Sequence, residues 1–420
     1  MSLDLVVVGL GYVGLPLAAR AREAGLATTG LDTCEQVVRG LRAGRSHVGD
    51  VPDDVVAGMV SSGFEPTADP AVLAEADTVV LCVPTGLSDS GEPDLTAVRA
   101  AARTVGEHLR PGTLVVLEST SFPGTTEEVV LPLLESGSGL VVGDDFHLVY
   151  SPERIDPGNA SFGVHNTPKV VGGVTPLCAK YGVAFYSGVV DAPLVVSKGT
   201  REAEMSKLLE NTHRYLNIAL VNEVATYCDS ADIDVWDVLH CAATKPFGYS
   251  PFHPGPGVGG HCIPVDPRYL GSKARAEGFT FSTLEAAHAV NERMPEHVCS
   301  RVGRILRNEG KSAQRANVVL LGVAYKRDVP DTRQSPAYPV ARGLMSRGAR
   351  VRYHDPNVQE FTVDGEPVPA ADDLRAALAA ADVAVLLQDH SCYSAADLTN
   401  SGCPVLDTRG RYAGENVTLL

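Results

Sequence analysis

The sequence lacks a long apolar run, lacks paired cysteines and is short of positive charge. No apolar stretch reaches the roughly 18 residues that a membrane span needs, so no transmembrane segment is expected. The nine cysteines are scattered and never spaced C-x-x-C, which suggests neither a disulfide framework nor a metal site. Lys and Arg number 35 against 51 Asp and Glu, giving a net charge of −16, so non-specific binding to nucleic acid or membrane is not expected.

What is present is an ordinary globular composition in a long chain. The 420 residues are 44% hydrophobic and 20% charged, enough for two to three domains with large cores. The first apolar run already begins at Leu3, which leaves no room for a signal peptide. We therefore expect a reduced, cytoplasmic, multi-domain enzyme or binder.

Apolar runs typical of buried parallel strands occur at both ends of the chain and alternate with helical stretches. In the first half they cover residues 3–8, 26–31, 78–83 and 113–117. From 199 to 307 the apolar residues recur at helical spacing, interrupted by a Pro/Gly-rich segment at 245–267 that predicts one long functional loop. After 316 the alternation resumes, and residues 318–322, 351–355 and 381–387 echo the strands ending near Gly9, Asp32 and Leu81.

These patterns predict an α/β protein with two Rossmann-like, doubly wound parallel-sheet domains joined by a helical middle domain. The expected boundaries are residues 1–198, 199–310 and 311–420. The alternative is one large α/β domain that carries a helical insertion.

A glycine-rich turn follows the first predicted strand. It reads Gly9-Leu-Gly11-Tyr-Val-Gly14, in which the three glycines permit a tight turn, the approach of a pyrophosphate and close helix–sheet packing. Asp32 ends the second strand, where a carboxylate accepts both ribose hydroxyls and repels a 2′-phosphate, so NAD is favoured over NADP. The alternative is that the glycines serve the turn only. The echo at Gly322 has lost the glycine pattern and should bind something other than a dinucleotide.

Two pairs of reactive side chains lie in the helical middle. Lys207 and Asn211 are four residues apart on one helix face, where they could bind a sugar hydroxyl and stabilise an alkoxide, although an exposed polar face is the alternative. Cys262 ends a glycine-rich loop whose backbone can pass close to a ligand, and Asp266 follows four residues later. An ionisable thiol can trap an aldehyde as a thiohemiacetal, with buried packing as the alternative. The other eight cysteines are expected to be small core residues.

Two further candidates follow strands of the first half. Thr120 and Glu153 come at strand carboxyl ends, where ligands bind in an open α/β sheet, although caps or turn residues would look the same.

The order of these motifs resembles the nucleotide-sugar 6-dehydrogenases, the UDP-glucose/GDP-mannose dehydrogenase family, over essentially the whole chain. The similarity is strongest to the branch that acts on UDP-N-acetylglucosamine or UDP-N-acetylmannosamine. The matching segments are Gly9-Leu-Gly-Tyr-Val-Gly14, Val83-Pro-Thr85, Glu118-Ser-Thr120 with Pro123-Gly-Thr125, Ser151-Pro-Glu-Arg154, Lys207-Leu-Leu-Glu-Asn211, Asn217-Ile-Ala-Leu-Val-Asn-Glu223, residues 254–267, Ala324-Tyr-Lys326 with Asp331-Thr-Arg333-Gln-Ser-Pro336, and Asp407-Thr-Arg409.

The resemblance implies a role for each matching residue. Cys262 would be the nucleophile that carries a thiohemiacetal and then a thioester. Lys207 and Asn211 would hold the reacting oxygen, with Asp266 supporting water and proton transfer. The implied NAD contacts are Gly9, Gly11, Tyr12, Val13, Gly14, Asp32, Thr85, Thr120 (which also orders a water) and Arg333. The implied contacts to the UDP-sugar are Glu153 (also the base for thioester hydrolysis), Arg154, Lys207, Asn211, His253, Gly255, Gly257, Gly259, Lys326 and Arg409.

The resemblance also implies a homodimer built through a long central helix, with a UDP-sugar as substrate and a place in polysaccharide biosynthesis. Pro157 stands where many UDP-glucose enzymes carry an acid, and His261 and Val265 also depart from them, so UDP-N-acetylglucosamine is the expected sugar. UDP-glucose, dTDP-glucose and UDP-N-acetylmannosamine are alternatives. A two-electron hydroxyacid dehydrogenase and a non-catalytic nucleotide-sugar binder are the competing classes.

Overall fold

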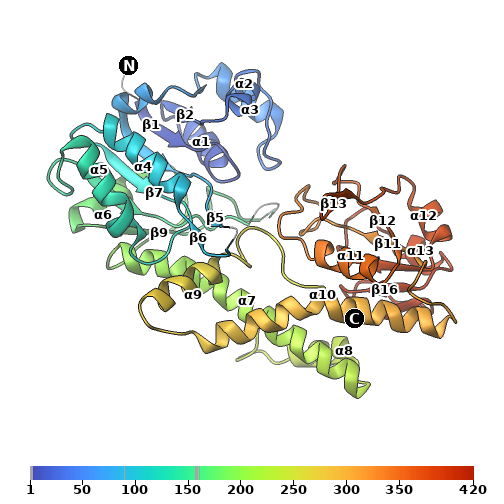
Figure 1. The fold of residues 1–420 in the computed structure, drawn as a ribbon. Helices are drawn as coiled ribbons and strands as arrows, with labels where there is room; N and C mark the ends of the chain where they lie inside the picture. Colours follow the sequence, from blue (N-terminus) through green and yellow to red (C-terminus); the bar gives the residue numbers. More distant parts are fainter. Residues whose placement is uncertain (1–2, 89, 157–158, 160) are drawn as a thin grey trace. The chain divides into compact units, whose positions relative to one another are not determined.

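The computed structural model describes residues 3–88, 90–156, 159 and 161–420. Its internal contacts divide the chain into two compact units. The first unit comprises residues 1–210 and 268–279, and the second comprises residues 211–267 and 280–420. Each unit contains its own largely parallel sheet, and Figure 1 labels several strands of each.

The first unit is built on an eight-stranded sheet. In spatial order its strands are β10 (Leu194–Val196), β9 (Lys169–Gly173), β8 (His147–Tyr150), β7 (Leu114–Leu117), β4 (Ala76–Leu81), β1 (Leu3–Val8), β2 (Thr28–Leu31) and β3 (Glu65–Thr67). All neighbours from β3 through β8 pair in parallel, and Val6 faces both Thr29 and Val79. The order reverses between β1 and β4, which is the switch point at which Rossmann folds bind dinucleotides.

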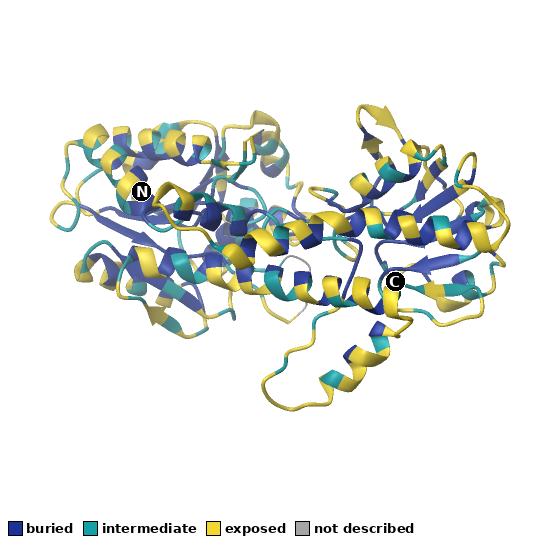
Figure 2. Ribbon diagram, turned by 60° about the horizontal axis from the view of Figure 1, so that its bottom comes forward, coloured by how far each residue is buried: buried dark blue, intermediate teal, exposed yellow. Residues whose placement is uncertain are grey.

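The central strands of this sheet, β1, β4, β7 and β8, are mostly apolar and buried because both faces of the sheet are covered there (Figure 2). Leu5 and Val7 share a core with the helices α1 and α6, and right-handed crossovers direct α4 and α5 to the opposite face. The helical segments of this unit are α1 (Gly14–Glu23), α2 (Glu35–Arg42), α3 (Asp53–Ser61), the short 3₁₀ helix η1 (Pro70–Glu75), α4 (Thr96–His108), the π-helical turn η2 (Thr125–Val130), α5 (Leu131–Ser138) and α6 (Pro176–Ser187).

The structure departs from the expected strand pattern in three places. The strand β9 runs antiparallel to β8, so this edge of the sheet is mixed. The strand β3 is only three residues long and contains Pro66, which hides it from a search for apolar runs. A small hairpin, β5 (Gly86–Leu87) with β6 (Pro93–Asp94), follows the predicted third strand.

The second unit contains the predicted repeat. Its five-stranded sheet has the order β12 (Arg350–His354), β11 (Asn317–Leu321), β15 (Val383–Leu386), β16 (Val405–Asp407) and β17 (Val417–Leu419), with every pair parallel. As β1 lies between β2 and β4, so β11 lies between β12 and β15. The predicted echoes therefore occupy equivalent positions, and two Rossmann-like sheets are confirmed.

Helices cover both faces of the second sheet. Val318 and Leu320 share a core with α10 (Ser282–Asn308) and α11 (Ala337–Ser346). Val319 and Leu321 point the other way, toward α12 (Leu374–Ala380) and α13 (Ala395–Thr399). A hairpin, β13 (Thr362–Val363) with β14 (Glu366–Pro367), completes the unit.

The middle of the chain is helical, as predicted, and includes the long helix α7 (Thr200–Ala231). It is followed by α8 (Val235–Ala243), α9 (Asp266–Ala276) and α10. The predicted loop at 245–267 contains no helix or strand before α9 begins at Asp266. Of the helices that the structure describes, none is long and apolar enough to cross a membrane.

Candidate active site

The predicted residues of the first unit follow the carboxyl ends of parallel strands that lie side by side. The glycine turn follows β1, Asp32 follows β2, Thr85 follows β4, Thr120 follows β7 and Glu153 follows β8. Parallel strands bring these ends to one edge of the sheet, where an open α/β sheet binds its ligands.

The three glycines of the turn are needed for different reasons. Gly9 has a φ of +90°, and a Cβ on Gly14 would lie 1.8 Å from the carbonyl oxygen of Gly9, so only glycine fits both positions. A Cβ on Gly11 would meet no protein atom within 4 Å. Packing therefore explains Gly9 and Gly14, whereas the space beside Gly11 fits a pyrophosphate at the start of α1.

Asp32 is held in place by the backbone of this turn. Its Oδ2 accepts the N–H of Leu10 at 2.9 Å, and its Oδ1 accepts the N–H of Cys34 at 2.8 Å. Each oxygen keeps acceptor capacity for a ribose hydroxyl. The residues present therefore fit NAD.

Glu153 and Lys207 are both buried in the first unit. Glu153 is 9% exposed and Lys207 is 8% exposed, which excludes a solvent-exposed polar face for Lys207. Burial alone would raise the pKa of Glu153, but the charge of Lys169, the N–H of Ile155 and the charge of Lys207 lower it overall. Glu153 is thus ionised at neutral pH, within electrostatic reach of Lys207.

No local sequence signal points to the cation that contacts Glu153. Lys169, at the start of β9, places its Nζ 2.9 Å from Glu153 Oε2 and 2.7 Å from Glu118 Oε1. Glu118 is completely buried and also accepts the hydroxyl of Tyr186. Two carboxylates thus share one buried lysine. The three residues meet because β7, β8 and β9 lie side by side, although they are far apart in the sequence.

Arg154, next to Glu153, is largely engaged by neighbouring groups. Its Nε and Nη2 contact the carboxylate of Glu210 at 3.1 and 2.8 Å, and its Nη1 donates to the carbonyl of Pro168 at 3.0 Å. The other two of its five N–H groups have no hydrogen-bond partner among the described residues. The departure at Pro157 lies outside the described residues.

A second missed residue, Glu204, joins α7 to the segment that follows Thr120. Its carboxyl group accepts the N–H of Gly124 at 2.6 Å, the N–H of Thr126 at 2.8 Å and the Thr126 hydroxyl at 2.7 Å. Burial raises the pKa of Glu204 to about 7, against these hydrogen bonds, which lower it. Glu204 lies one turn before Lys207, so it connects the segments that carry Lys207 and Thr120.

The second unit brings together three of the predicted catalytic residues. The carbonyl oxygen of Cys262 accepts the N–H of Asp266 at 2.8 Å, so the two residues are one turn apart. The Asp266 carboxylate is buried, and its Oδ2 accepts the amide of Asn211 at 2.5 Å. Cys262 itself is partly exposed. A partly exposed cysteine thus lies one turn before the aspartate of a hydrogen-bonded amide–carboxylate pair.

The glycines of the Cys262 loop are packed against protein atoms. A Cβ on Gly259 would lie 2.8 Å from the Cβ of Tyr325, and one on Gly260 would lie 2.8 Å from the Tyr325 ring. The loop is also fixed by the buried side chain of Asn222, whose Oδ1 accepts the N–H of Gly255 at 3.0 Å. Close packing within the second unit therefore accounts for Gly259 and Gly260 without a ligand.

The other predicted substrate residues lie at strand ends of the second sheet or on this loop. Lys326 follows β11 and Arg409 follows β16, so both lie at the carboxyl edge. The guanidinium of Arg409 donates to the carbonyl of Leu387 at 2.7 Å, and a Cβ on Gly255 would be 3.2 Å from it. A Cβ on Gly257 would lie 3.2 Å from Pro336.

Two further predicted residues of the second unit contact neighbouring side chains. His253 is exposed and stacks on Trp236, and Arg333 is paired with Asp331 at 2.6 Å.

The expectation that the other eight cysteines are core residues is partly wrong. All nine are free, and Cys82, Cys178, Cys228, Cys299 and Cys403 are buried, but Cys34, Cys241 and Cys392 are exposed. The three exposed thiols lie at the start of α2, on α8 and in a loop, where an apolar neighbourhood in sequence did not indicate burial.

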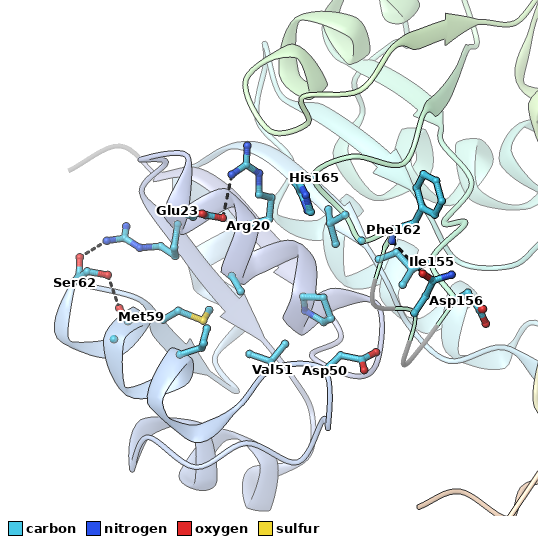
Figure 3. A pocket seen from close by; sticks show the side chains of 18 residues that line it. Arg20, Glu23, Asp50, Val51, Met59, Ser62, Ile155, Asp156, Phe162 and His165 are labelled. Carbon is cyan, nitrogen blue, oxygen red and sulfur yellow. Dashed lines mark hydrogen bonds and ion pairs between the residues drawn. The ribbon is translucent and has the colours of Figure 1, made fainter. Parts of the chain in front are cut away.

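A cavity of about 600 Å³ lies between α1, α3 and the stretch that includes Ile155 and His165 (Figure 3). None of the predicted site residues lines it. Its Arg20 is already paired with Glu23 and Asp191 at 3.0 and 2.9 Å. Among the residues that the structure describes, no group of three or more His, Cys, Asp or Glu side chains could hold a metal ion.

The Rossmann sheet, the glycine turn and Asp32 are features of a dinucleotide-binding domain of the kind that oxidoreductases use. Residues 3–190 match the NAD binding domain of the UDP-glucose/GDP-mannose dehydrogenase family, residues 201–293 its central domain and residues 319–413 its UDP binding domain. The chain belongs to this family and is an NAD-dependent nucleotide-sugar 6-dehydrogenase.

Similar proteins cover nearly the whole chain. It is 36% identical over 357 residues to the UDP-N-acetyl-D-glucosamine 6-dehydrogenase of Pseudomonas aeruginosa, covering 84% of this chain and 83% of that protein. It is 34% identical over 398 residues to the UDP-N-acetyl-D-mannosamine dehydrogenase of Escherichia coli K12, covering 92% and 93%. The structure of a UDP-D-ManNAc dehydrogenase from Pyrococcus horikoshii is similar with a TM-score of 0.90 at 31% identity, covering 99% and 98%.

The position of Asp32 predicts a preference for NAD over NADP. A 2′-phosphate would lie beside this carboxylate, and the next residues, Thr33, Cys34 and Glu35, supply no compensating cation. We expect kcat/KM to favour NAD by at least about a hundredfold, and Asp32→Ser to gain use of NADP. Glu35→Ser, on the exposed start of α2, should keep the wild-type preference. Equal use of both dinucleotides by the wild type would contradict this role.

The raised pKa of Glu204 predicts a loss of stability with rising pH. The folded protein holds this proton more tightly than an unfolded chain with an ordinary glutamate pKa of 4.5. Its contribution is therefore complete below that pH and is lost as pH rises through about 7. The shift corresponds to a free energy on the order of 3 kcal/mol.

Urea unfolding of the wild type and Glu204→Gln from pH 5 to pH 8 measures this contribution. The variant should be weakened by its lost hydrogen bonds at every pH, but its disadvantage should shrink as pH rises. The exposed Glu202→Gln on the same helix should show no such trend. A gap between wild type and Glu204→Gln that is the same at pH 5 and pH 8 would rule out titration of Glu204.

Proposed function

We propose that the protein oxidises the C6 hydroxymethyl group of a UDP-sugar to a carboxylate in two steps of two electrons each. The observation that supports this most directly is the set in the second unit, where the Cys262 carbonyl accepts the Asp266 N–H and Asp266 accepts the amide of Asn211. A two-electron hydroxyacid dehydrogenase needs no thiol, and a non-catalytic binder needs none of these groups.

The chemistry balances with one water and two NAD. When bound, NAD accepts a hydride from C6 in each oxidation. The alcohol becomes an aldehyde, the Cys262 thiol adds to it as a thiohemiacetal, and the second oxidation leaves a thioester. Water then attacks the thioester, which releases the acid and regenerates the thiol. One sugar, two NAD and one water thus give one carboxylate, two NADH and three protons.

We assign roles to the other candidate residues from their chemistry and position. Lys207 and Asn211, one turn apart on α7, would stabilise the oxygen from which a proton leaves during oxidation. Asp266 would support proton transfer, and Thr120 would order a water. Glu153, ionised at the sheet edge, would accept a proton from the attacking water.

We propose three functional parts: residues 1–198 for NAD, 199–310 for the catalytic loop and dimerisation, and 311–420 for the UDP-sugar. The three family matches support this division. Within it, Gly9, Gly11, Tyr12, Val13, Gly14, Asp32, Thr85, Thr120 and Arg333 would contact NAD. Glu153, Arg154, Lys207, Asn211, His253, Gly255, Gly257, Gly259, Lys326 and Arg409 would contact the substrate.

We also infer a homodimer formed through α7. Leu209, Leu220 and Tyr227 are 58%, 58% and 63% exposed, and their spacing places them on one face of this helix. An apolar stripe of this size on a helix surface is typical of an interface. Sedimentation should give a dimer for the wild type and a monomer for Leu220→Glu; a monomeric wild type would overturn the inference.

Replacement of Cys262 tests the covalent mechanism. Cys262→Ala should abolish formation of the acid while leaving NAD binding intact. Cys262→Ser should accumulate a covalent ester, because an oxygen ester hydrolyses more slowly than a thioester. The wild type should form two NADH per sugar with no free aldehyde. These outcomes are read from NADH absorbance, product analysis and the intact mass of the protein.

The exposed cysteine of α8 provides a matched control. Cys241→Ala should keep the turnover and the stoichiometry of the wild type. Near-normal turnover by Cys262→Ala would exclude covalent catalysis, and one NADH per sugar would indicate two-electron chemistry instead.

We propose UDP-N-acetylglucosamine as the substrate. The relative from Pseudomonas aeruginosa acts on this sugar, according to its name, and Arg154 retains two N–H groups that could donate to an N-acetyl carbonyl. UDP-N-acetylmannosamine, the substrate named for the Escherichia coli relative, has the same acetamido group with the opposite configuration at C2. UDP-glucose and dTDP-glucose remain the alternatives without that group.

A panel of nucleotide sugars assayed with NAD tests the choice of sugar. We expect kcat/KM to be highest for UDP-N-acetylglucosamine, with the uronic acid identified by mass spectrometry. Arg154→Lys, which keeps the charge but loses the paired N–H geometry, should lower kcat/KM for N-acetyl sugars more than for UDP-glucose. A kcat/KM for UDP-glucose well above that for both N-acetyl sugars would overturn the choice and leave the four-electron chemistry unaffected.

A further inference from the structure

We propose that Lys169 and Glu118 are positioning residues that hold Glu153 ready to activate the water in thioester hydrolysis. The proposal rests on the proposed function, because it takes Glu153 as the base for that step. Lys169 lies between the two acids, with its Nζ 2.7 Å from Glu118 Oε1 and 2.9 Å from Glu153 Oε2. All three residues belong to the first compact unit.

The geometry leaves Glu153 little freedom. Its Oε1 accepts the N–H groups of Arg154 and Ile155, both at 2.7 Å, while its Oε2 contacts Lys169. Both oxygens are therefore oriented, and the carboxylate lies where β8 ends at the binding edge of the sheet. Lys169 is 5% exposed, so its charge is only weakly screened by water.

The two acids differ in their surroundings. Burial raises the pKa of Glu118, and Lys169 compensates for this only in part. Lys169, backbone N–H groups and Lys207 together lower the pKa of Glu153. Glu118 lies deeper and also contacts the Tyr186 hydroxyl and the Cys82 thiol. Lys169, placed between the fully buried Glu118 and Glu153 at the sheet edge, thus keeps Glu153 ionised.

This arrangement predicts opposite effects for two substitutions. Lys169→Met removes the cation, so Glu153 should bind a proton at higher pH. Glu118→Gln removes the competing negative charge, so Lys169 pairs with Glu153 alone and Glu153 should bind a proton at lower pH. The other ionisable groups around Glu153 stay the same in both variants: Lys207, Arg154 with Glu210, Tyr186 and Cys82.

The experiment follows decay of the thioester on Cys262 against pH in the full-length enzyme. UDP-N-acetylglucosamine, or the sugar that the panel identifies, is mixed with excess NAD, and the reaction is quenched for intact mass. The rate of thioester decay should fall at low pH, where Glu153 is protonated, and we call this fall the acid limb. Its midpoint should move up by about one to three pH units in Lys169→Met and should move down in Glu118→Gln. The initial burst of NADH, which precedes hydrolysis, should keep its amplitude.

A merely structural role would give a different pattern. Both variants would then lose burst amplitude at every pH, with the acid limb unmoved or displaced in the same direction, and the proposal would be wrong. Lys169→Arg, which keeps the charge, should return the limb toward its wild-type position. If Lys169→Met does not fold, Lys169→Arg and Glu118→Gln still decide the direction of the shift. Lys311→Met, which breaks an ion pair of 2.7 Å with Asp382 in the second unit, should leave the limb unmoved.

Glu153→Gln separates failure of this proposal from failure of the proposed function. If the thioester accumulates in Glu153→Gln but the acid limb does not respond to Lys169 and Glu118, the base is correct and the positioning role is wrong. If the thioester forms and decays normally in Glu153→Gln, Glu153 is not the base, so the positioning role is wrong while the four-electron chemistry stands. If no thioester forms in the wild type, the proposed function itself is wrong.

Discussion

Parallel pairing of strands is the constraint on which the rest of this structure depends. Because β3, β2, β1, β4, β7 and β8 all run in one direction, every segment that follows one of them emerges at the same edge. The glycine turn, Asp32, Thr120 and Glu153, which span more than a hundred residues of sequence, thereby lie along one edge of the sheet. The second sheet applies the same rule to Lys326 and Arg409.

This constraint explains why much of the protein could be predicted from its sequence. Strands covered on both faces are continuous apolar runs, so β1, β4, β7, β11 and β15 were visible as such. The residues after those runs were then candidates for the site. Where a strand is short or at an edge, this signal fails: Pro66 interrupts β3, and nothing in the Val-Val-Gly-Gly sequence of β9 indicates that it runs antiparallel.

The two missed residues, Lys169 and Glu204, share a physical cause with Glu118, which was noted only as part of a matching segment. All three are charged, and a charged residue in a sequence is normally expected at the surface. Their burial depends on partners from distant segments, which no local spacing reveals: Lys169 needs the ends of β7 and β8, and Glu204 needs the backbone of Gly124 and Thr126. The glycines near Cys262 show the opposite case, since packing against Tyr325 accounts for residues that the pattern alone assigned to ligand approach.

The buried cluster of Lys169, Glu118 and Glu153 has an energetic consequence of its own. Moving charged groups out of water is unfavourable, and a well-packed apolar trio is often at least as stable as a buried ion pair. The cluster therefore has no evident basis in stability alone, and two acids on one base leave a residual negative charge that burial opposes. Such an arrangement is understandable where an ionised carboxylate is needed at a binding edge. Glu118 and Lys169 fix both the position and the protonation state of Glu153, which lies at that edge.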